Sequence, residues 1–385
     1  MNKTILALNT VSGLAHLAQI GVIYPLLALW LDAGGMPTWQ IGLVETSVWL
    51  GMLIGNLFAP MWLHRLGPAA LAAAGCLGSA LLALLMPHLQ PDALIAWSLA
   101  AALLGVCLGL RWIGVESWLY AIVDDSQRGR FVGLHETIIN AAQGAGPSLI
   151  ALLGVMGNKS FYAAAVLGTL AVLPLLWARI PMPASVDDAA MHPLAVLTGL
   201  LRHARRSLPI QLGLLAGVID GVLFGMLSIY FVHQGLSASQ AAFMMTVFGI
   251  GGLLLQLPLG WWSDRRGVHS ATRIVALLGL AGTALLLPGN PLLAWPAAAL
   301  LGSVAAGGLA VTIIAATQSA VGDNKHMALA VTEISIAFTL GCTVGPVLAG
   351  AMMNAWGQAC LPLLSAVACV GLYGIARKSQ EPKRA

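Results

Sequence analysis

Hydrophobic residues occur along this chain in long runs, separated by short polar or glycine- and proline-rich segments. The runs are continuous and do not alternate with polar residues, which favours membrane-crossing helices over a β-barrel. No Asp, Glu, Lys or Arg occurs between Arg273 and Asp323, or between Glu333 and Arg377. Each of these segments exceeds the roughly 20 residues that cross a bilayer and contains one turn, so each predicts a pair of spans.

The whole pattern predicts an all-α integral membrane protein with twelve transmembrane helices. The expected spans are residues 5–31, 39–62, 68–89, 93–122, 131–154, 160–179, 209–232, 238–262, 271–288, 291–319, 327–353 and 357–377. Because their number is even, both termini are expected on the same side of the membrane. The first run is far longer than the core of a signal peptide and lacks a small-x-small cleavage site, so we expect it to be retained as a span.

Composition and charge agree with this reading. The chain is 59% hydrophobic and 8% charged, whereas a soluble domain is about a quarter charged. Nearly all of the 18 lysines and arginines fall at the same set of span ends; Lys159 lies on the other side and Arg111 lies within a span. The positive-inside rule therefore predicts that both termini lie in the cytoplasm. We expect a multi-pass protein of the bacterial inner membrane. The net charge of +4 reflects this topology and attraction to the lipid bilayer, not nucleic-acid binding.

The five cysteines lie in apolar segments without C-x-x-C spacing. This arrangement indicates small packing residues and no disulfide framework or zinc site. Paired methionines, such as Met244 and Met245, are interpreted as apolar filler and not as ligands of a soft metal. We expect no metal and no cofactor.

Residues 180–208 form the only long polar connection and divide the chain into similar halves. We expect an N-terminal six-helix bundle at 1–179, a cytoplasmic linker at 180–208 and a C-terminal six-helix bundle at 209–385. A shift of 200 residues aligns "LFAPMWLHRLG" with "LPLGWWSDRRG" and Gly35 with Gly235. Such a register predicts two pseudo-symmetric bundles that are parallel repeats.

Two motifs carry a resemblance to a known family. The segment "GWWSDRRG" matches G-x-x-x-D-R-x-G at Gly260, Asp264, Arg265 and Gly267, and "GCTVGPVLAG" at 341–350 is similar to g-x-x-x-G-P-x-x-G-G. The chain resembles the major facilitator superfamily over its whole length, and "GVESWLYAIVDDSQRGR" and its neighbours look like the YcaD-type branch. In the first half, His64 replaces the aspartate that the family usually has in the first motif.

The resemblance implies a transporter with no enzymatic activity, in which the two bundles rock about a central site. It also implies that Asp264 and Arg265, with Gly260 and Gly267, belong to a cytoplasmic gate. We add Arg130 and Glu333 to the residues expected at that gate. In this architecture helices 1, 4, 7 and 10 surround the central path, so the resemblance directs a set of polar residues inward: His16, Gln19, Arg111 and Asp220. The tenth span adds Gln318 as a candidate for the path.

Ionisable residues within the spans are the main candidates for function. A charge at the middle of a bilayer costs about 2.5–3.5 kcal/mol on insertion scales, so each should face a partner or water. Arg111 and Glu116 share the fourth span. On the fifth span Glu136, Asn140 and Gln143 recur at i, i+4 and i+7, which predicts one polar face.

The sequence leaves two readings open for Glu116 and Glu136. If the two carboxyls meet across the helical hairpin, one can carry a proton. Alternatively, either one pairs with Arg128 or Arg130 as a structural inner gate. Asp220 likewise can line the transport path or form a hydrogen bond between helices.

The residues together predict a secondary active transporter for a small organic solute. No phosphate-binding G-x-x-x-x-G-K-[ST] motif is present, so ATP does not drive transport directly and we expect a proton gradient to do so. The resemblance associates the glycine-proline pattern, present in the eleventh span and more loosely as "AAQGAGPSLIALLG" in the fifth, with antiporters, so we expect efflux. We expect the protein to act as a monomer. The alternatives are proton symport of an anionic metabolite, with Arg111 as the partner of the anion, and a membrane solute sensor that does not transport.

Overall fold

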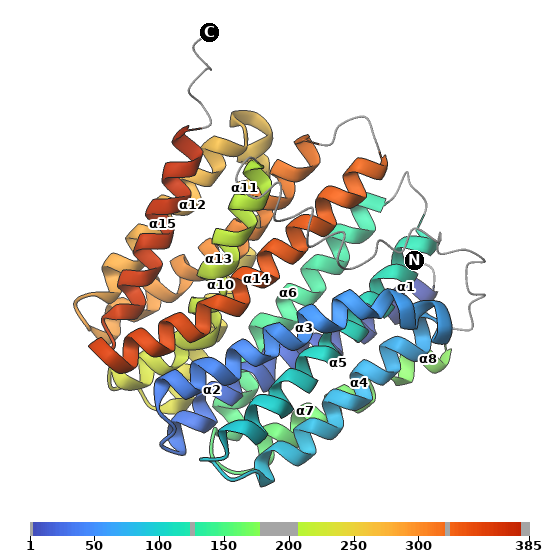
Figure 1. Cartoon of the computed structure of the whole chain (residues 1–385), viewed down its shortest axis with the longest axis horizontal. Helices are drawn as coiled ribbons and strands as arrows, with labels where there is room; N and C mark the ends of the chain where they lie inside the picture. Colours follow the sequence, from blue (N-terminus) through green and yellow to red (C-terminus); the bar gives the residue numbers. More distant parts are fainter. Residues whose placement is uncertain (1–2, 124–127, 178–206, 320–323, 379–385) are drawn as a thin grey trace. The chain divides into compact units, whose positions relative to one another are not determined.

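The computed structural model describes residues 3–123, 128–177, 207–319 and 324–378, and these residues are almost entirely helical (Figure 1). In the first half the helices are α1 (Lys3–His16), the π-helix η1 (Leu17–Ile23), α2 (Tyr24–Ala33), α3 (Thr38–Leu66), α4 (Pro68–Leu85), the 3-10 helix η2 (Met86–His88), α5 (Leu94–Ile122), α6 (Arg128–Leu153), α7 (Lys159–Leu170) and α8 (Leu173–Trp177). In the second half they are α10 (Leu208–His233), α11 (Ala238–Arg266), α12 (Val268–Leu286), α13 (Pro291–Ser319), α14 (Asn324–Trp356) and α15 (Cys360–Lys378). The predicted all-helical membrane fold is confirmed.

Eleven of the helical segments in the described part of the chain are long and apolar enough to cross a membrane. The expected span that is not among these eleven is residues 131–154, and it corresponds to α6. This helix has 26 residues and is therefore about 39 Å long at 1.5 Å per residue. It reaches across a bilayer by length, but the polar face that contains Glu136 and Gln143 lowers its hydropathy. The sequence explains why this helix differs from the others.

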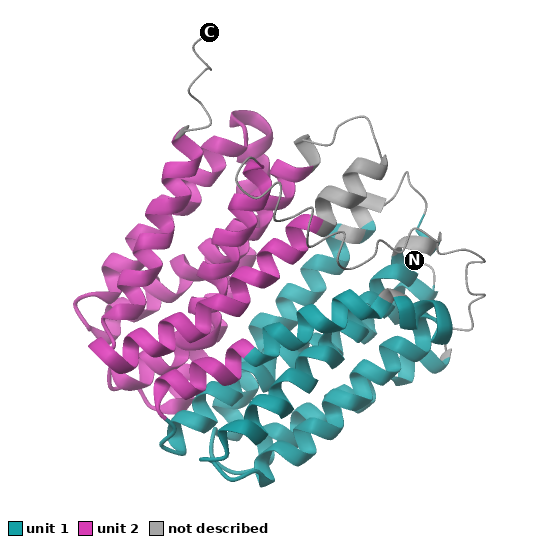
Figure 2. Cartoon of the chain, viewed as in Figure 1, with its two compact units in different colours: residues 1–36, 47–191 teal, residues 37–46, 192–385 magenta. Residues whose placement is uncertain are grey.

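The residues cluster into two compact units (Figure 2). Unit 1 comprises 1–36 and 47–191, and unit 2 comprises 37–46 and 192–385. The start of α3 belongs to unit 2 because it packs on α14: Thr38 Oγ1 donates to the Gly350 carbonyl at 3.1 Å, and Thr46 Oγ1 donates to the Thr343 carbonyl at 2.8 Å.

The predicted repeat is visible in local backbone geometry. Gly35 and Gly235 have φ of 81° and 92°, and Gly67 and Gly267 have φ of 78° and 81°. Each member of a pair lies 200 residues from the other, and each follows the end of a helix. Glycine occurs at these four positions because it adopts positive φ without the steric cost of a side chain.

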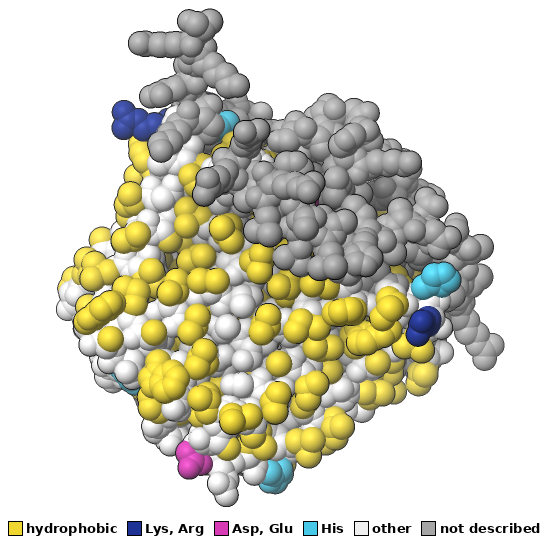
Figure 3. Space-filling model, in the orientation of Figure 1, with side chains coloured by type: hydrophobic (Ala, Val, Ile, Leu, Met, Phe, Trp, Pro, Cys, Tyr) yellow, Lys and Arg dark blue, Asp and Glu magenta, His cyan; other side chains and the backbone are white. Residues whose placement is uncertain are grey.

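Large hydrophobic side chains cover much of the described surface on the face that Figure 3 shows. Ile95, Leu152 and Leu292 are 77–80% exposed. Exposed leucines and isoleucines in this number are unfavourable in water but suit contact with lipid.

Glycines allow two pairs of helices to pack closely. In unit 2, a Cβ on Gly221 would lie 2.6 Å from the Cys342 carbonyl oxygen, and one on Gly345 would lie 2.7 Å from the Val222 nitrogen. In unit 1, Gly146 meets the backbone of Gly21. Such small residues let helix backbones approach one another in membranes. The glycine-proline motifs of the fifth and eleventh expected spans therefore lie at tight packing points on the first helix of each half.

Candidate functional site

Arg111 lies at the centre of a buried polar cluster in unit 1. Its Nε donates to Gln19 Oε1 at 3.2 Å, and its Nη2 lies 2.9 Å from His16 Nδ1. The Trp112 ring centroid is 5.5 Å from the guanidinium carbon. Only 1% of Arg111 is exposed. The Gln19 and His16 side chains therefore give this arginine hydrogen-bond partners within the spans.

The Arg111 contact fixes the protonation state of His16. A guanidinium only donates hydrogen bonds, so His16 Nδ1 must accept and must be unprotonated. His16 is therefore a neutral imidazole with its proton on Nε2. Its ring also packs 5.5 Å from that of Trp112 at an angle of 53°.

Gln19 lies in the π-helix η1, whose turns are wider than those of an α-helix, and its side chain connects Arg111 to α4. The Tyr24 N–H donates to the Gln19 carbonyl, the i to i−5 bond of a π-helix. The Gln19 amide nitrogen donates to Ser79 Oγ at 2.7 Å and to the Gly75 carbonyl at 3.3 Å. Short π-helical turns occur frequently at functional sites. His16 and Gln19 together link α1, η1, α4 and α5.

Glu116 and Glu136 lie close enough to interact electrostatically, on α5 and α6. The Trp112 side chain donates a hydrogen bond to Glu116, and Arg111 is also within electrostatic range. Both carboxyls are half-buried. The structure thus brings together the two acids that the sequence suggested could meet.

The polar face of α6 continues from Glu136 through Asn140 and Gln143, which are also half-buried. Next to Glu136, His135 Nδ1 lies 2.7 Å from Asn9 Oδ1, and both residues are 2% exposed. This buried pair ties α6 to α1. The sequence reading missed it, although Asn9 and His16 have the i, i+7 spacing of one helix face.

Asp220 lies midway along α10 in unit 2 and is half-buried. The Cys342 thiol of α14 donates to its Oδ2 over 4.0 Å, the limit for a sulfur donor. The sequence left open a hydrogen bond between Asp220 and another helix. The contact that the structure shows there is weak.

The residues expected at the gate lie at the end of α11 and in α14. Asp264 and Arg265 are exposed, and the Arg265 guanidinium carbon lies 4.0 Å from the centre of the Trp261 ring. Gly267 joins α11 to α12, and its N–H donates to the Ser263 carbonyl at 2.8 Å. Gly260 lies within α11 and Glu333 within α14, and both are half-buried.

Two expected site residues, Arg130 and Gln318, have side chains outside the described part of the structure. The same holds for residues 178–206, which include most of the expected linker with its arginines.

Glu45 is a buried carboxyl that the sequence reading overlooked. It lies in α3 and is 0% exposed. An acid inside the expected span 39–62 was the available signal, since a charge at that depth requires an explanation.

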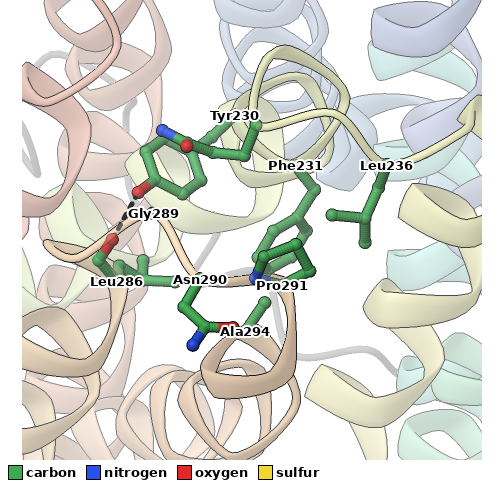
Figure 4. Close-up of a pocket in the computed structure, with 9 residues that line it drawn as sticks. Tyr230, Phe231, Leu236, Leu286, Gly289, Asn290, Pro291 and Ala294 are labelled. Carbon is green, nitrogen blue, oxygen red and sulfur yellow. Dashed lines mark hydrogen bonds between the residues drawn. The ribbon is translucent and has the colours of Figure 1, made fainter.

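A small pocket lies in unit 2 between the α10–α11 and α12–α13 turns (Figure 4). Its lining includes Tyr230, Gln234 and Asn290, and the Tyr230 hydroxyl donates to the Leu286 carbonyl at 2.8 Å. The internal volume is about 10 Å³, which is about the space of one water molecule. The pocket is too small for an organic solute.

Within the described ranges no group of three or more His, Cys, Asp or Glu side chains is arranged to hold a metal ion. The five cysteines are free thiols, and all except Cys107 are buried.

Comparison with known proteins shows the family of this chain. Residues 10–233 and 212–384 each match the family model for the Major Facilitator Superfamily. An uncharacterised MFS-type transporter of Enterobacter sp. (strain 638) is 28% identical over 373 residues, which cover 94% of this chain and 92% of that protein. The uncharacterised MFS-type transporter YcaD of Escherichia fergusonii is 27% identical over 354 residues, covering 89% and 87% of the two chains. The expected resemblance to YcaD-type proteins is confirmed.

Solved structures give the same fold. The crystal structure of the nucleoside transporter NupG aligns over 100% of both chains with a TM-score of 0.82 and 13% identity. Identity this low shows the fold and says nothing of the solute. Family and fold are those of transporters and not of enzymes. The chain therefore belongs to the major facilitator superfamily and is a multi-pass membrane protein that acts as a secondary transporter.

Proposed function

We propose that this transporter exports a small organic solute from the cytoplasm in exchange for protons. The observation that carries the proposal is the proximity of the Glu116 and Glu136 carboxyls in unit 1. Two carboxylates within electrostatic range of each other are costly to ionise together, so one of them can hold a proton.

The buried Arg111 cluster supports export over the symport of an anion. A guanidinium that is 1% exposed and donates to Gln19 and His16 is not available to an anionic solute in this conformation. The glycine-proline motifs add weaker support, because the family resemblance associates them with antiporters.

The proposed mechanism is alternating access between the two repeats about a substrate site near the membrane midplane. Asn140 and Gln143 extend the polar face of α6 beyond Glu136 and would line the proton path. Asp264 and Arg265, with Gly260 and Gly267, would form the cytoplasmic gate together with Arg130 and Glu333. Loss of contacts there would release the two bundles to rock.

The remaining parts of the proposal concern placement and assembly. We propose location in the bacterial inner membrane with both termini in the cytoplasm, a linker at 180–208 between two six-helix bundles, and action as a monomer. The positive-inside distribution of lysine and arginine supports the orientation.

Proton-coupled export is tested in everted inner-membrane vesicles that contain the overproduced protein. Respiration acidifies the vesicle interior, and the quenching of an acridine dye reports the pH gradient. Cationic, neutral and anionic organic solutes are added outside, the face that was cytoplasmic. An exported solute should enter the vesicles, release protons and restore dye fluorescence.

Glu116→Gln and Glu136→Gln keep the size of each side chain but cannot ionise. Each should lower the initial rate of fluorescence recovery by at least tenfold, whereas Asp92→Asn, in an exposed turn, should leave it unchanged. Unaltered recovery in both glutamine variants would exclude these carboxyls as the proton carriers. Accumulation of an anionic solute by right-side-out vesicles, driven by an inward proton gradient, would instead show symport.

A further inference from the structure

Carboxyls outnumber cations deep in the described spans. Among described residues that lie six or more positions from both ends of their helix, the acids are Glu45, Glu116, Glu136, Asp220 and Glu333, and the one Lys or Arg is Arg111. Arg111 is shielded, with 1% of its surface exposed. All of these acids except Glu45 are half-buried. The charge that a solute can approach at this depth is therefore negative.

Asp220 is the deepest of these acids. It lies 12 residues after the start of α10 and 13 before its end, or roughly 18–20 Å from either end of the helix. The other acids lie within nine residues of one end of their helices. Asp220 is therefore the carboxyl nearest the level at which secondary transporters bind their solutes.

The exposure of Asp220 is local. Every residue from Gly221 to Phe231 is buried, and so is Ile219 on its other side. Asp220 is therefore a partly exposed residue next to a buried stretch of α10. The structure gives this carboxylate the Cys342 thiol at 4.0 Å as a polar contact, and a thiol is a weak donor without positive charge.

The surroundings of Asp220 suit an organic group. Phe224 lies one turn further along α10, and its ring packs 6.1 Å from that of Phe248 on α11. Close backbone contact of Gly221 with Cys342 holds α10 firmly against α14. A charged group on a fixed helix, beside an apolar wall, has the features of a pre-organised binding site.

We infer, resting on the proposed function, that Asp220 of unit 2 is the substrate-binding carboxylate and that the solute is an organic cation. The proton carboxyls Glu116 and Glu136 belong to unit 1, so proton and solute bind to separate acids. An organic cation replaces the water that an ionised Asp220 loses within the membrane and compensates its charge. An anion would be repelled, and a neutral solute would leave the charge uncompensated.

Equilibrium binding to the purified full-length protein in detergent tests this assignment without a proton gradient. The probes are radiolabelled tetraphenylphosphonium and the smaller cation benzyltrimethylammonium. Tetraphenylborate has nearly the same shape as tetraphenylphosphonium but the opposite charge, and serves as competitor. Asp220→Asn removes the charge, Asp220→Glu keeps it, and Asp92→Asn is the matched control in an exposed turn.

We expect saturable binding of at least one cation, no competition by tetraphenylborate, and at least tenfold weaker binding to Asp220→Asn. Asp220→Glu should bind within about threefold of the unaltered protein, and Asp92→Asn should bind equally well. Equal binding by Asp220→Asn, effective competition by tetraphenylborate, or no saturable binding of either cation would each overturn the assignment. If cations bind but the vesicles show no coupled proton movement, only the proposed proton coupling fails.

A second measurement does not depend on the stability of a variant. Dicyclohexylcarbodiimide modifies protonated carboxyls in apolar surroundings, and mass spectrometry locates the adduct. Tetraphenylphosphonium should reduce labelling of Asp220 at least fivefold and leave Glu116 and Glu136 labelled. Protection of the two glutamates without protection of Asp220 would place the cation elsewhere.

Discussion

Arg111 Nη2 and His16 Nδ1 lie 2.9 Å apart in the interior of unit 1, so a buried arginine donates to a neutral histidine. The bond joins α1 to α5 across 95 positions of sequence. A second bond, from Arg111 Nε to Gln19 Oε1, fixes the plane of the guanidinium. These contacts give Arg111 a positioning role, since they hold the first span in place beside the helix that contains Glu116.

Arg111→Ala should destabilise the protein. The substitution leaves Gln19 and His16 without their donor, and hydrogen bonds to charged groups contribute about 1.5–3 kcal/mol each. The melting temperature in detergent should fall clearly. It is measured as the temperature at which the monodisperse peak in size-exclusion chromatography is lost. Arg65→Ala, on an exposed arginine at the end of α3, should change it little. Equal melting of the two variants would remove the positioning role.

His16 offers a finer test of the same bond. Asparagine can place its side-chain oxygen near the position of Nδ1, whereas leucine fills the space without an acceptor. His16→Asn should melt close to the unaltered protein, and His16→Leu should melt lower because a buried guanidinium N–H loses its acceptor, at a cost of about 1–3 kcal/mol. The exposed His88, changed to leucine, provides the control. If asparagine destabilises as much as leucine, the ring itself matters more than its Nδ1 acceptor.

These partners show where prediction from sequence reached its limit. The hydrophobic runs predicted the spans, and the aligned segments predicted the 200-residue repeat, because both can be read from local sequence. The contacts of Arg111 lie 92 and 95 residues away in sequence, and no pattern in a single span indicates them. The π-helix at 17–23 also changes which residues share a face, so ordinary helical spacing could not place Gln19 relative to His16.

The acidic residues show the same difference between features that the sequence predicts and features that depend on packing. Helical spacing predicted that Glu136, Asn140 and Gln143 share a face, and their common partial exposure agrees with it. The position of Asp220 in mid-span was likewise readable from the sequence. Its contact with Cys342 was not, because that contact depends on how closely the glycines of α10 and α14 let the helices approach.

The contact between α10 and α14 should tolerate no added methyl group at Gly221. A Cβ there would lie 2.6 Å from the Cys342 carbonyl oxygen and 2.9 Å from its Cα, and backbone atoms cannot rotate away. Overpacking of this kind costs about 1–3 kcal/mol, so Gly221→Ala should lower the melting temperature. Gly374→Ala makes the same chemical change in α15, where a Cβ meets no atom within 4 Å. That control should be neutral or slightly stabilising, since alanine favours helix. Similar losses in both variants would point to a general effect of the substitution.

The turn between α11 and α12 depends on the backbone of Gly267. With φ at 81° and ψ at 158°, this residue has a conformation that costs an alanine about 1–3 kcal/mol, although a Cβ there would meet no atom within 4 Å. Gly267→Ala should therefore destabilise through the backbone alone and shift the register of Asp264 and Arg265 relative to α12. Gly260→Ala, seven residues earlier in a helical and uncrowded position, should stabilise slightly or have no effect. An added Cβ meets no atom within 4 Å at either position, and of the two only Gly267 has a positive φ. Comparing the two melting temperatures therefore isolates the cost of the backbone conformation. Under the proposed gating role, protease accessibility of the cytoplasmic turn should rise in Gly267→Ala and not in Gly374→Ala, which lies outside the proposed gate. A Gly267→Ala protein with unchanged melting temperature and unchanged cleavage would show that the turn has an alternative conformation and that the gate does not depend on this glycine.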